Sequence, residues 1–187
     1  MKKPYRKNLS PGWCILERYR NIFLFKPFRR NKLLIDRFDL KIIEQLQRND
    51  NLSIAQLAEG VGLSVTPCWR RIQRLEKEGV IEKRIAVLNP EKLNLGLTVF
   101  VMIKTDKHNQ TWLDAFKEAV QSFPEVMEVN RLAGEYDYLL KVITRDNQSF
   151  DAFYKRLIAK IELSNVTSCF SMEQVKKTTE LPLGDII

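Results

Sequence analysis

The sequence is poor in the residues that build metal centres, disulfide frameworks and hydrolytic sites. Its cysteines, Cys14, Cys68 and Cys169, are odd in number and far apart, so neither a disulfide framework nor a paired-cysteine zinc site is expected. The single histidine, His108, lies in the polar stretch KTDKHNQT, which is typical of a solvated loop. There is no nucleophile elbow and no phosphate-binding glycine loop. We therefore expect no enzyme, no catalytic residue, no metal and no cofactor.

Long apolar runs are also missing. No stretch approaches the roughly 20 apolar residues that a membrane-spanning helix requires. The apolar run IFLF near the start is four residues long, and Pro27 follows it closely, so it does not resemble the core of a secretory signal. Together with the scattered cysteines, this pattern predicts a cytoplasmic globular protein.

Positive charge is concentrated at the start of the chain. Residues 1–34 hold ten Lys and Arg but one acid, Glu17, whereas the remaining residues hold 21 basic and 22 acidic groups. The net charge of +8 therefore comes from the first 34 residues and argues for a nucleic-acid partner only through them. We interpret residues 1–34 as a basic extension that is disordered or a start-site artefact. An arm that holds DNA phosphates is the other interpretation.

Three short amphipathic helices are predicted from residue 35 onward. Ser53 and Ser64 are suited to cap the second and third helices, and Gly62 to make the turn between them. Gly79 suits a left-handed stop after the third helix, and residues 80–90 indicate a strand, forming a small wing. The predicted buried stripes are Ile35, Phe38, Ile42, Ile43 and Leu46; Ile54, Leu57, Ala58 and Val61; and Val65, Cys68, Ile72 and Leu75.

A second unit is predicted after the polar link 91–96. Strand patterns occupy residues 97–105, 126–134, 136–144 and 166–178, and amphipathic helices occupy residues 111–123 and 149–161. The order βαββαβ is the split pattern of ferredoxin-like sandwiches. The fold class is therefore α+β, with a winged helix-turn-helix domain over residues 35–90 and a βαββαβ sandwich over residues 97–178. Residues 179–187 are expected to form a C-terminal tail.

The third helix has a basic outward face. At about 100° per residue, Thr66, Arg70, Gln73 and Lys77 lie opposite the apolar stripe, Arg74 lies beside them, and Trp69 and Arg71 flank them. A solvated surface is one interpretation of this face. However, residues 53–72 have the layout of a helix-turn-helix, whose second helix enters the major groove, where arginine suits guanine and glutamine suits adenine. The predicted DNA-facing set is Ser64, Thr66, Pro67, Trp69, Arg70, Arg71, Gln73 and Arg74.

Three motifs in order resemble one family. LAEGVGLSVTPCWRRIQRLEKEGVI, then VLNPEKLNLGLTVFVMI, then GEYDYLLKV are similar to the Lrp/AsnC family of amino-acid-responsive transcription regulators. The resemblance covers roughly residues 35–180 and implies DNA binding and dimers that often assemble into octamers. TPCWRRIQRLE, GEYDYLL, FYKRL and VTSCFSMEQVKKTTELP further resemble its DecR-like, cysteine-responsive branch. Cysteine is thus the favoured effector, with leucine or methionine next.

The resemblance also implies where an effector binds. In the family the small molecule lies between dimers, near the loop that joins the second and third strands of the sandwich. On this chain that loop belongs to RLAGEYD, expected to face the last strand. The implied effector-binding set is Arg131, Gly134, Tyr136, Asp137, Cys169, Phe170 and Ser171. A hairpin turn at Gly134 with ordinary strand tyrosines is the alternative, and Arg131 is equally suited to a salt bridge between dimers.

Two other function classes stay open from the residues alone. Siroheme decarboxylases, which process a tetrapyrrole, resemble the same two-domain architecture, although the single histidine speaks against that chemistry. A ferredoxin-like sheet can also carry RNA, but this needs stacking aromatics together with positive charge. Burial of the open sheet face in a homo-oligomer, dimer or octamer, explains the strand aromatics better.

Overall fold

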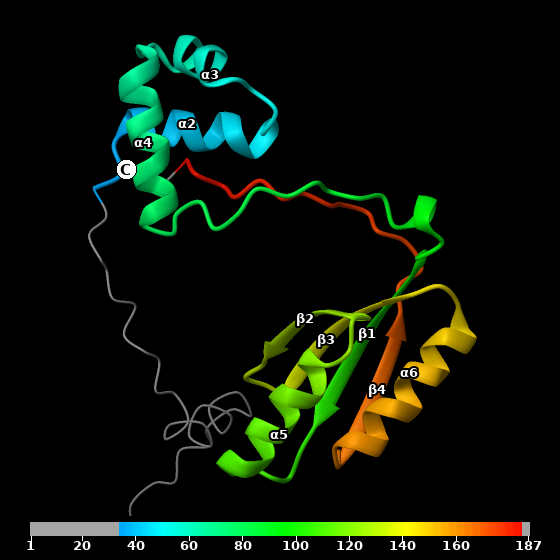
Figure 1. The fold of residues 1–187 in the computed structure, drawn as a ribbon. Helices are drawn as coiled ribbons and strands as arrows, with labels where there is room; N and C mark the ends of the chain where they lie inside the picture. Colours follow the sequence, from blue (N-terminus) through cyan, green and yellow to red (C-terminus); the bar gives the residue numbers. More distant parts are fainter. Residues whose placement is uncertain (1–33, 185–187) are drawn as a thin grey trace, which may run out of the picture. The chain divides into compact units, whose positions relative to one another are not determined.

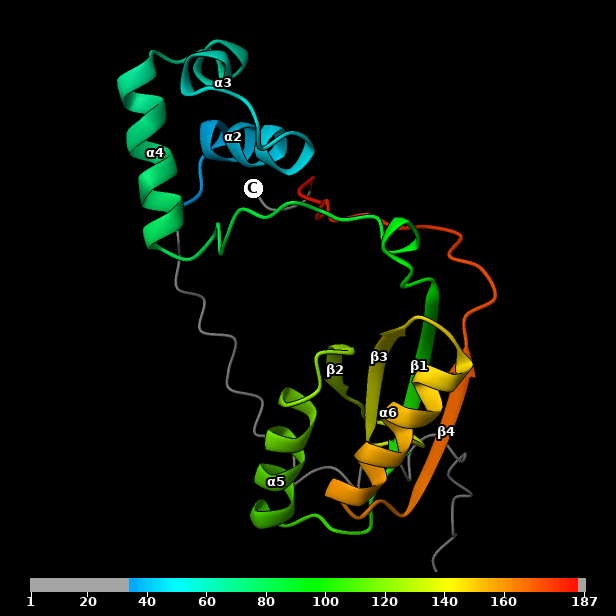
Figure 2. The same cartoon turned by 45° about the vertical axis from the view of Figure 1, so that its right-hand side comes forward.

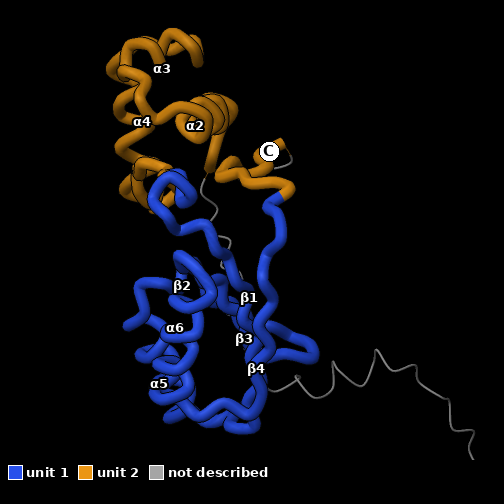
Figure 3. The backbone as a smooth tube through the Cα atoms, turned by 90° about the vertical axis from the view of Figure 1, so that its right-hand side faces the viewer, with its two compact units in different colours: residues 1–27, 89–174 blue, residues 28–88, 175–187 orange. Residues whose placement is uncertain are grey.

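Residues 34–184 are described in the computed structural model, and they fall into two units. Residues 34–88 together with 175–184 make one unit, and residues 89–174 make the other (Figure 3). The predicted basic extension lies outside the described residues except for Leu34. Within the described part of the chain, no helix is long and apolar enough to cross a membrane.

The first unit is built on three helices (Figure 1), α2 (Arg37–Arg48), α3 (Ile54–Val61) and α4 (Val65–Lys77). Ser53 caps α3 as predicted: its hydroxyl accepts from the Gln56 amide, and the Gln56 side chain accepts from the Ser53 amide. Gly62 ends α3 in the left-handed region, at φ 77°, where a side chain would be strained. The predicted helix-turn-helix is therefore present, with α4 as its second helix.

The core of this unit follows most of the predicted stripes, but Ile35 and Phe38 are only half-buried and lie outside it, and there are three further departures. Ile42, Leu57, Cys68 and Leu75 are at most 1% exposed. The prediction was wrong for Ile54 and Val65, which are 37% and 50% exposed because each lies in the first turn of its helix. The third departure is an acid, since Asp39 is completely buried although the periodicity of α2 gave no reason to expect it.

The segment predicted to form the wing strand does not form one. No strand occurs in residues 80–90 of the described chain, and residues 82–89 are exposed. A strand is stable only when it pairs with another, and none of the described residues pairs with this segment. The 3₁₀-helix η1 (Glu91–Leu93) follows in the predicted link.

The second unit is a four-stranded sheet covered by two helices (Figure 2). Its elements are β1 (Leu97–Lys104), α5 (Gln110–Gln121), β2 (Val126–Arg131), β3 (Tyr138–Thr144), α6 (Asn147–Lys160) and β4 (Asn165–Phe170). The strand order is β2-β3-β1-β4, and every neighbouring pair is antiparallel. The predicted βαββαβ sandwich is confirmed. The last strand is shorter than predicted, because it ends at Phe170 rather than extending to residue 178.

The two faces of this sheet differ. On the helix-covered face, alternate residues of the central strands are buried in one core with the α5 and α6 aromatics. This core includes Val99, Val101, Ile103, Leu140, Val142, Phe116 and Phe153. On the open face no helix of this unit packs, and the residues between the buried ones lie there, among them Phe100, Met102, Leu139 and Ile143. The open face therefore carries several apolar side chains along β1 and β3, with Lys104 and Lys141 among them.

Candidate nucleic-acid interface and effector site

Most of the predicted DNA-facing residues lie on the exposed surface of α4. Ser64, Thr66, Pro67, Trp69, Arg70 and Gln73 are all exposed, and Trp69 is 47% exposed despite its size. The Gln73 amide is held by its own helix, since its Nε2 donates to Glu76 Oε2 at 3.0 Å. Arg70 makes no ion pair with any described residue. The exposed face of α4 therefore presents the Arg70 guanidinium, the Trp69 ring and the hydroxyl groups of Ser64 and Thr66 to solvent.

The N-terminus of α4 leaves polar groups available for an anion. Ser64 stands at the N-cap position, but its side chain makes no capping hydrogen bond, contrary to the prediction. Pro67 lies in the first turn, where a residue without an N–H breaks no helical hydrogen bond. The amides of a first turn and the positive end of the helix dipole together favour a phosphate.

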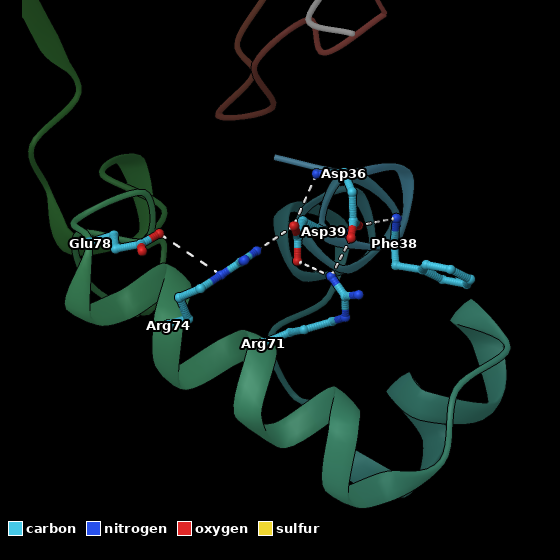
Figure 4. A network of polar contacts seen from close by, with 6 residues as sticks. All are labelled: Asp36, Phe38, Asp39, Arg71, Arg74 and Glu78. Atoms are coloured by element: carbon cyan, nitrogen blue, oxygen red, sulfur yellow. Dashed lines mark hydrogen bonds and ion pairs between the residues drawn. The ribbon is translucent and has the colours of Figure 1, made fainter. Parts of the chain in front are cut away.

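The other two arginines of α4 have their head groups turned to α2 (Figure 4). Arg71 Nη1 donates to Asp39 Oδ1 at 2.8 Å, and Arg74 Nη2 donates to Asp39 Oδ2. Asp39 Oδ2 also accepts from the Asp36 amide at 3.0 Å. Both carboxylate oxygens of this completely buried aspartate are therefore hydrogen-bonded, and two guanidinium groups compensate its charge.

Asp36 joins the same cluster and begins α2. Its Oδ1 accepts from the Phe38 and Asp39 amides at 2.8 and 3.0 Å, and its Oδ2 accepts from Arg71 Nη1 at 2.7 Å. Burial alone would raise the pKa of Asp36, but the Asp39 amide and the Arg71 guanidinium outweigh it and lower that pKa. The hydrogen bonds to Asp39 and Asp36 in turn raise the pKa of Arg71. The cap of α2 is thus also a docking point for α4.

Arg74 is bound on both sides. Its Nε lies 3.9 Å from Glu78 Oε2, close enough for an ion pair but too far for a hydrogen bond. Its side chain is 41% exposed, and that of Arg71 is 26% exposed. We name Asp36, Asp39, Arg71 and Arg74 the aspartate–arginine cluster. It assigns two of the three predicted DNA-facing arginines to the α2–α4 contact and leaves Arg70 as the arginine that points freely outward.

The aspartate–arginine cluster was not predicted from the sequence. One local signal was available, since acids at the N-cap and three residues later form a capping box, as Asp36 and Asp39 do here. The partners of Asp39 lie 32 and 35 residues further along the chain. No local pattern links positions that far apart.

The loop expected to hold an effector is anchored to the end of β1. The Asp137 amide donates to the Ile103 carbonyl at 2.9 Å, and Asp137 Oδ2 accepts from the Thr105 amide at 2.9 Å. Tyr136 reaches over the open face, where its hydroxyl lies 3.3 Å from Thr167 Oγ1. The Lys104 ammonium lies 4.9 Å from the centre of the Tyr136 ring. Asp137 therefore has one oxygen committed to the loop, and Tyr136 lies over the strands.

The sheet separates the remaining members of the predicted effector set. Cys169 is opposite Phe100 in the register, on the open face with Tyr136. Phe170 lies on the opposite face, edge-on to Phe150 with 5.4 Å between ring centres, and Arg131 pairs with the buried Tyr138 on that same face. Adjacent strand residues point to opposite faces, so Cys169 and Phe170 cannot both line one side. Within one chain the predicted set does not form a single pocket.

The lysines of the open face are neutralised by acids. Lys104 Nζ lies 2.9 Å from Glu135 Oε1, and Lys141 Nζ lies 3.1 Å from Glu128 Oε1. A sheet that stacks RNA bases needs unpaired positive charge beside its aromatics. The open face does not supply it, which disfavours the RNA-binding alternative. The described residues contain no group of three or more His, Cys, Asp or Glu that could hold a metal ion.

Comparison with known protein families identifies both units. Residues 35–82 match a family described as winged helix-turn-helix DNA-binding, and residues 98–181 match the Lrp/AsnC ligand binding domain. The chain belongs to the Lrp/AsnC family. An Lrp/AsnC chain is a DNA-binding transcription regulator that responds to amino acids, and the resemblance found in the sequence is confirmed.

Individual Lrp/AsnC proteins are similar over nearly their whole length. The transcriptional activator DecR of Escherichia coli K12 is 48% identical over 151 residues, which covers 80% of this chain and 99% of DecR. An AsnC family regulator from Agrobacterium tumefaciens is 55% identical, with a TM-score of 0.77 over 79% of this chain and 97% of that one. Transcriptional regulator NMB0573 from Neisseria meningitidis, solved with L-methionine, is 35% identical, with a TM-score of 0.77 over 81% and 99%. These relatives are regulators, which decides against the enzyme alternative.

Proposed function

We propose that this Lrp/AsnC regulator reads DNA through the exposed face of α4. The observation that supports this proposal is that the three arginines of that helix have different surroundings. Arg71 and Arg74 bind the buried Asp39 of α2, whereas Arg70, with Trp69 and Thr66 beside it, faces outward. Arg70 is assigned to guanine O6 and N7 or to a phosphate, and the N-terminal turn of α4 to a phosphate.

The aspartate–arginine cluster has a positioning role in this proposal. A recognition helix reads bases only when it is held at a fixed angle to the rest of its domain. Two charge-assisted contacts to one buried carboxylate, at successive turns of α4, fix both the rotation and the height of that helix against α2. Arg71 and Arg74 therefore support the DNA contact without forming it.

We further propose that the sandwich binds a small amino acid, with cysteine favoured and leucine or methionine next. The resemblance of the sequence motifs to the cysteine-responsive, DecR-like branch supports cysteine, and the methionine complex of the Neisseria relative supports methionine. Because the sheet separates the expected contact residues, we assign the pocket to the junction of two copies, where loop 132–137 of one faces another. The ligand acts through linkage: it shifts the oligomer and DNA affinity only as far as it prefers one arrangement.

Calorimetric titration of the full chain with L-cysteine, L-methionine and L-leucine tests the effector. The proposal expects saturable heat for at least one of them, reduced by Tyr136→Ala and kept by Lys117→Ala, an exposed change on α5. Heat from methionine or leucine but not from cysteine would overturn the cysteine assignment. No heat from any of them would overturn the sensing role assigned to this loop.

A further inference from the structure

The last described residues belong to the DNA-binding unit. Residues 171–184 contain no helix or strand, and from residue 175 onward they group with the helices of that unit (Figure 3). Leu183 is the one buried residue in this stretch, at 9% exposure, whereas Met172 and Val175 are 96% and 88% exposed. The segment expected from its sequence to be a polar tail therefore has an anchored end.

The anchor is a side-chain amide on α2. Gln47 Oε1 accepts from the Leu181 amide at 2.7 Å, and Gln47 Nε2 donates to the Leu181 carbonyl at 3.4 Å. A glutamine amide carries one acceptor and one donor side by side, so it matches both backbone groups of one extended residue. Beside it, Arg48 Nε lies 3.5 Å from Glu180 Oε2, an exposed pair of small energetic weight.

The sequence of the segment is suited to this contact. Leu181 precedes Pro182, and the residue before a proline is restricted to extended conformations that present its N–H and C=O outward. Pro182 itself fixes one backbone angle and lowers the entropy lost on docking. Leu183 then supplies the apolar group that is buried. We name Glu180–Leu183 the C-terminal strap.

We propose that the last turn of α2 is a docking site for the C-terminal strap, and that the strap couples the sensor sheet to the recognition helix. This inference rests on the proposed function. The chain runs from β4 of the sheet through residues 171–179 directly into the strap. Within residues 34–184, two chain segments therefore link the units, one after α4 and one after β4.

Helix α2 connects the strap to the recognition helix. Its first turn holds Asp39, which binds Arg71 and Arg74 of α4, and its last turn holds Gln47, which binds the strap. A rearrangement of β4 that moves the strap acts on the same helix that sets the orientation of α4. A change in the sheet can therefore alter DNA affinity through the contacts of Gln47 with the strap and of Asp39 with α4.

Two variants test the strap, one by changing its docking site on α2 and the other by removing the strap itself. Gln47→Leu keeps the volume of the side chain and removes both hydrogen bonds, and a stop codon at position 179 removes the strap without altering α2. Gln121→Leu, an exposed glutamine at the end of α5, is the matched control. Hydrogen exchange of the backbone amides is measured for each protein in the absence of DNA. DNA affinity is measured separately by fluorescence anisotropy.

The expected result has three parts. The Leu181 amide exchanges slowly in the wild type and in Gln121→Leu, and at the rate of an unstructured peptide in Gln47→Leu. Exchange in the last turn of α2 accelerates in the truncated chain. Both strap variants lower DNA affinity by about threefold to tenfold, the range expected for losing one or two net hydrogen bonds.

Two outcomes would overturn the proposal. A Leu181 amide that exchanges at the unstructured rate in the wild type would remove the docking site itself. Slow exchange in the wild type together with unchanged DNA affinity in both variants would refute the coupling while the DNA-binding role stands. Failure of the wild type to bind any DNA is a different result, since it refutes the proposed function and leaves the exchange measurement valid.

Discussion

Single residues of α4 that look alike in the sequence have different surroundings. Arg70, Arg71 and Arg74 lie within five residues of one another, yet two bind a buried carboxylate and one points outward. Their substitution should therefore have different consequences. Loss of Arg70 should affect recognition, and loss of Arg71 or Arg74 should affect the helix that carries it.

Arg70→Ala is predicted to weaken specific DNA binding by about 1–3 kcal/mol, roughly five- to 150-fold, if Arg70 reads a guanine. The free energy of unfolding should change by less than about 0.5 kcal/mol, because the side chain is exposed. Anisotropy on the preferred duplex measures the first effect and urea unfolding the second. Lys41→Ala, which removes an exposed cation of α2, is the control and should bind as the wild type does.

Asp39→Ala is predicted to destabilise the DNA-binding unit by roughly 2–4 kcal/mol. Removing one member of a fully buried ion pair costs about 3–5 kcal/mol, and the partial exposure of Arg71 and Arg74 lowers that cost. Urea denaturation measures the change. Asp114→Ala, on the exposed side of α5, should be close to neutral, and equal stability of the two variants would contradict the positioning role.

At the scale of elements, local signals predicted the ends of the helices better than their contacts. The caps at Ser53 and Gly62 depend on neighbouring residues, so the sequence was sufficient to place them. The burial of Asp39 depends on guanidinium groups from another helix, and the anchoring of Leu181 depends on Gln47, 134 residues away. Such contacts leave no periodic pattern.

The two candidate sites likewise differ in how far local sequence patterns predicted them. The exposed face of α4 followed from helical periodicity, which places Thr66, Arg70 and Gln73 together. The effector set came from resemblance alone, and strand alternation divides it between the two faces of the sheet. The wing was predicted from β-rich composition, but residues 80–90 have no strand partner among the described residues, and composition does not determine pairing.

The start of α2 is predicted to make the DNA-binding unit sensitive to acid. The pKa of Asp36 is lower in the folded chain than the ordinary value of about 3.9, so the unfolded chain takes up its proton first as pH falls. The stabilisation from Asp36 is complete above that value and is lost as pH falls through the folded pKa. As pH is lowered from 6 to 2, the melting temperature of Asp36→Asn should fall less steeply than that of the wild type. Parallel curves for the two proteins would refute the prediction.

At the scale of the whole molecule, the open sheet face is expected to hold copies together. Phe100, Met102, Leu139 and Ile143 form an apolar surface that no helix of the sandwich covers. Phe100→Glu places a charge at its centre and should shift the protein toward the monomer in light scattering, with loss of cooperative DNA binding. Asp151→Lys, an exposed change on α6, should leave the mass of the oligomer in light scattering unchanged. An unchanged mass for Phe100→Glu would place the interface elsewhere.

The most direct test of the central claim is selection of duplexes from a random DNA pool by the full-length protein. The enriched duplex is then compared with a scrambled one by anisotropy at two salt concentrations. The account predicts enrichment of one motif, tighter binding of that motif than of the scrambled duplex, and affinity that falls steeply with salt as phosphate contacts require. It also predicts that Arg70→Ala loses most of this preference. A preference that survives in Arg70→Ala would assign Arg70 to a phosphate instead of a guanine. Enrichment of no sequence would contradict the claim that the exposed face of α4 reads DNA.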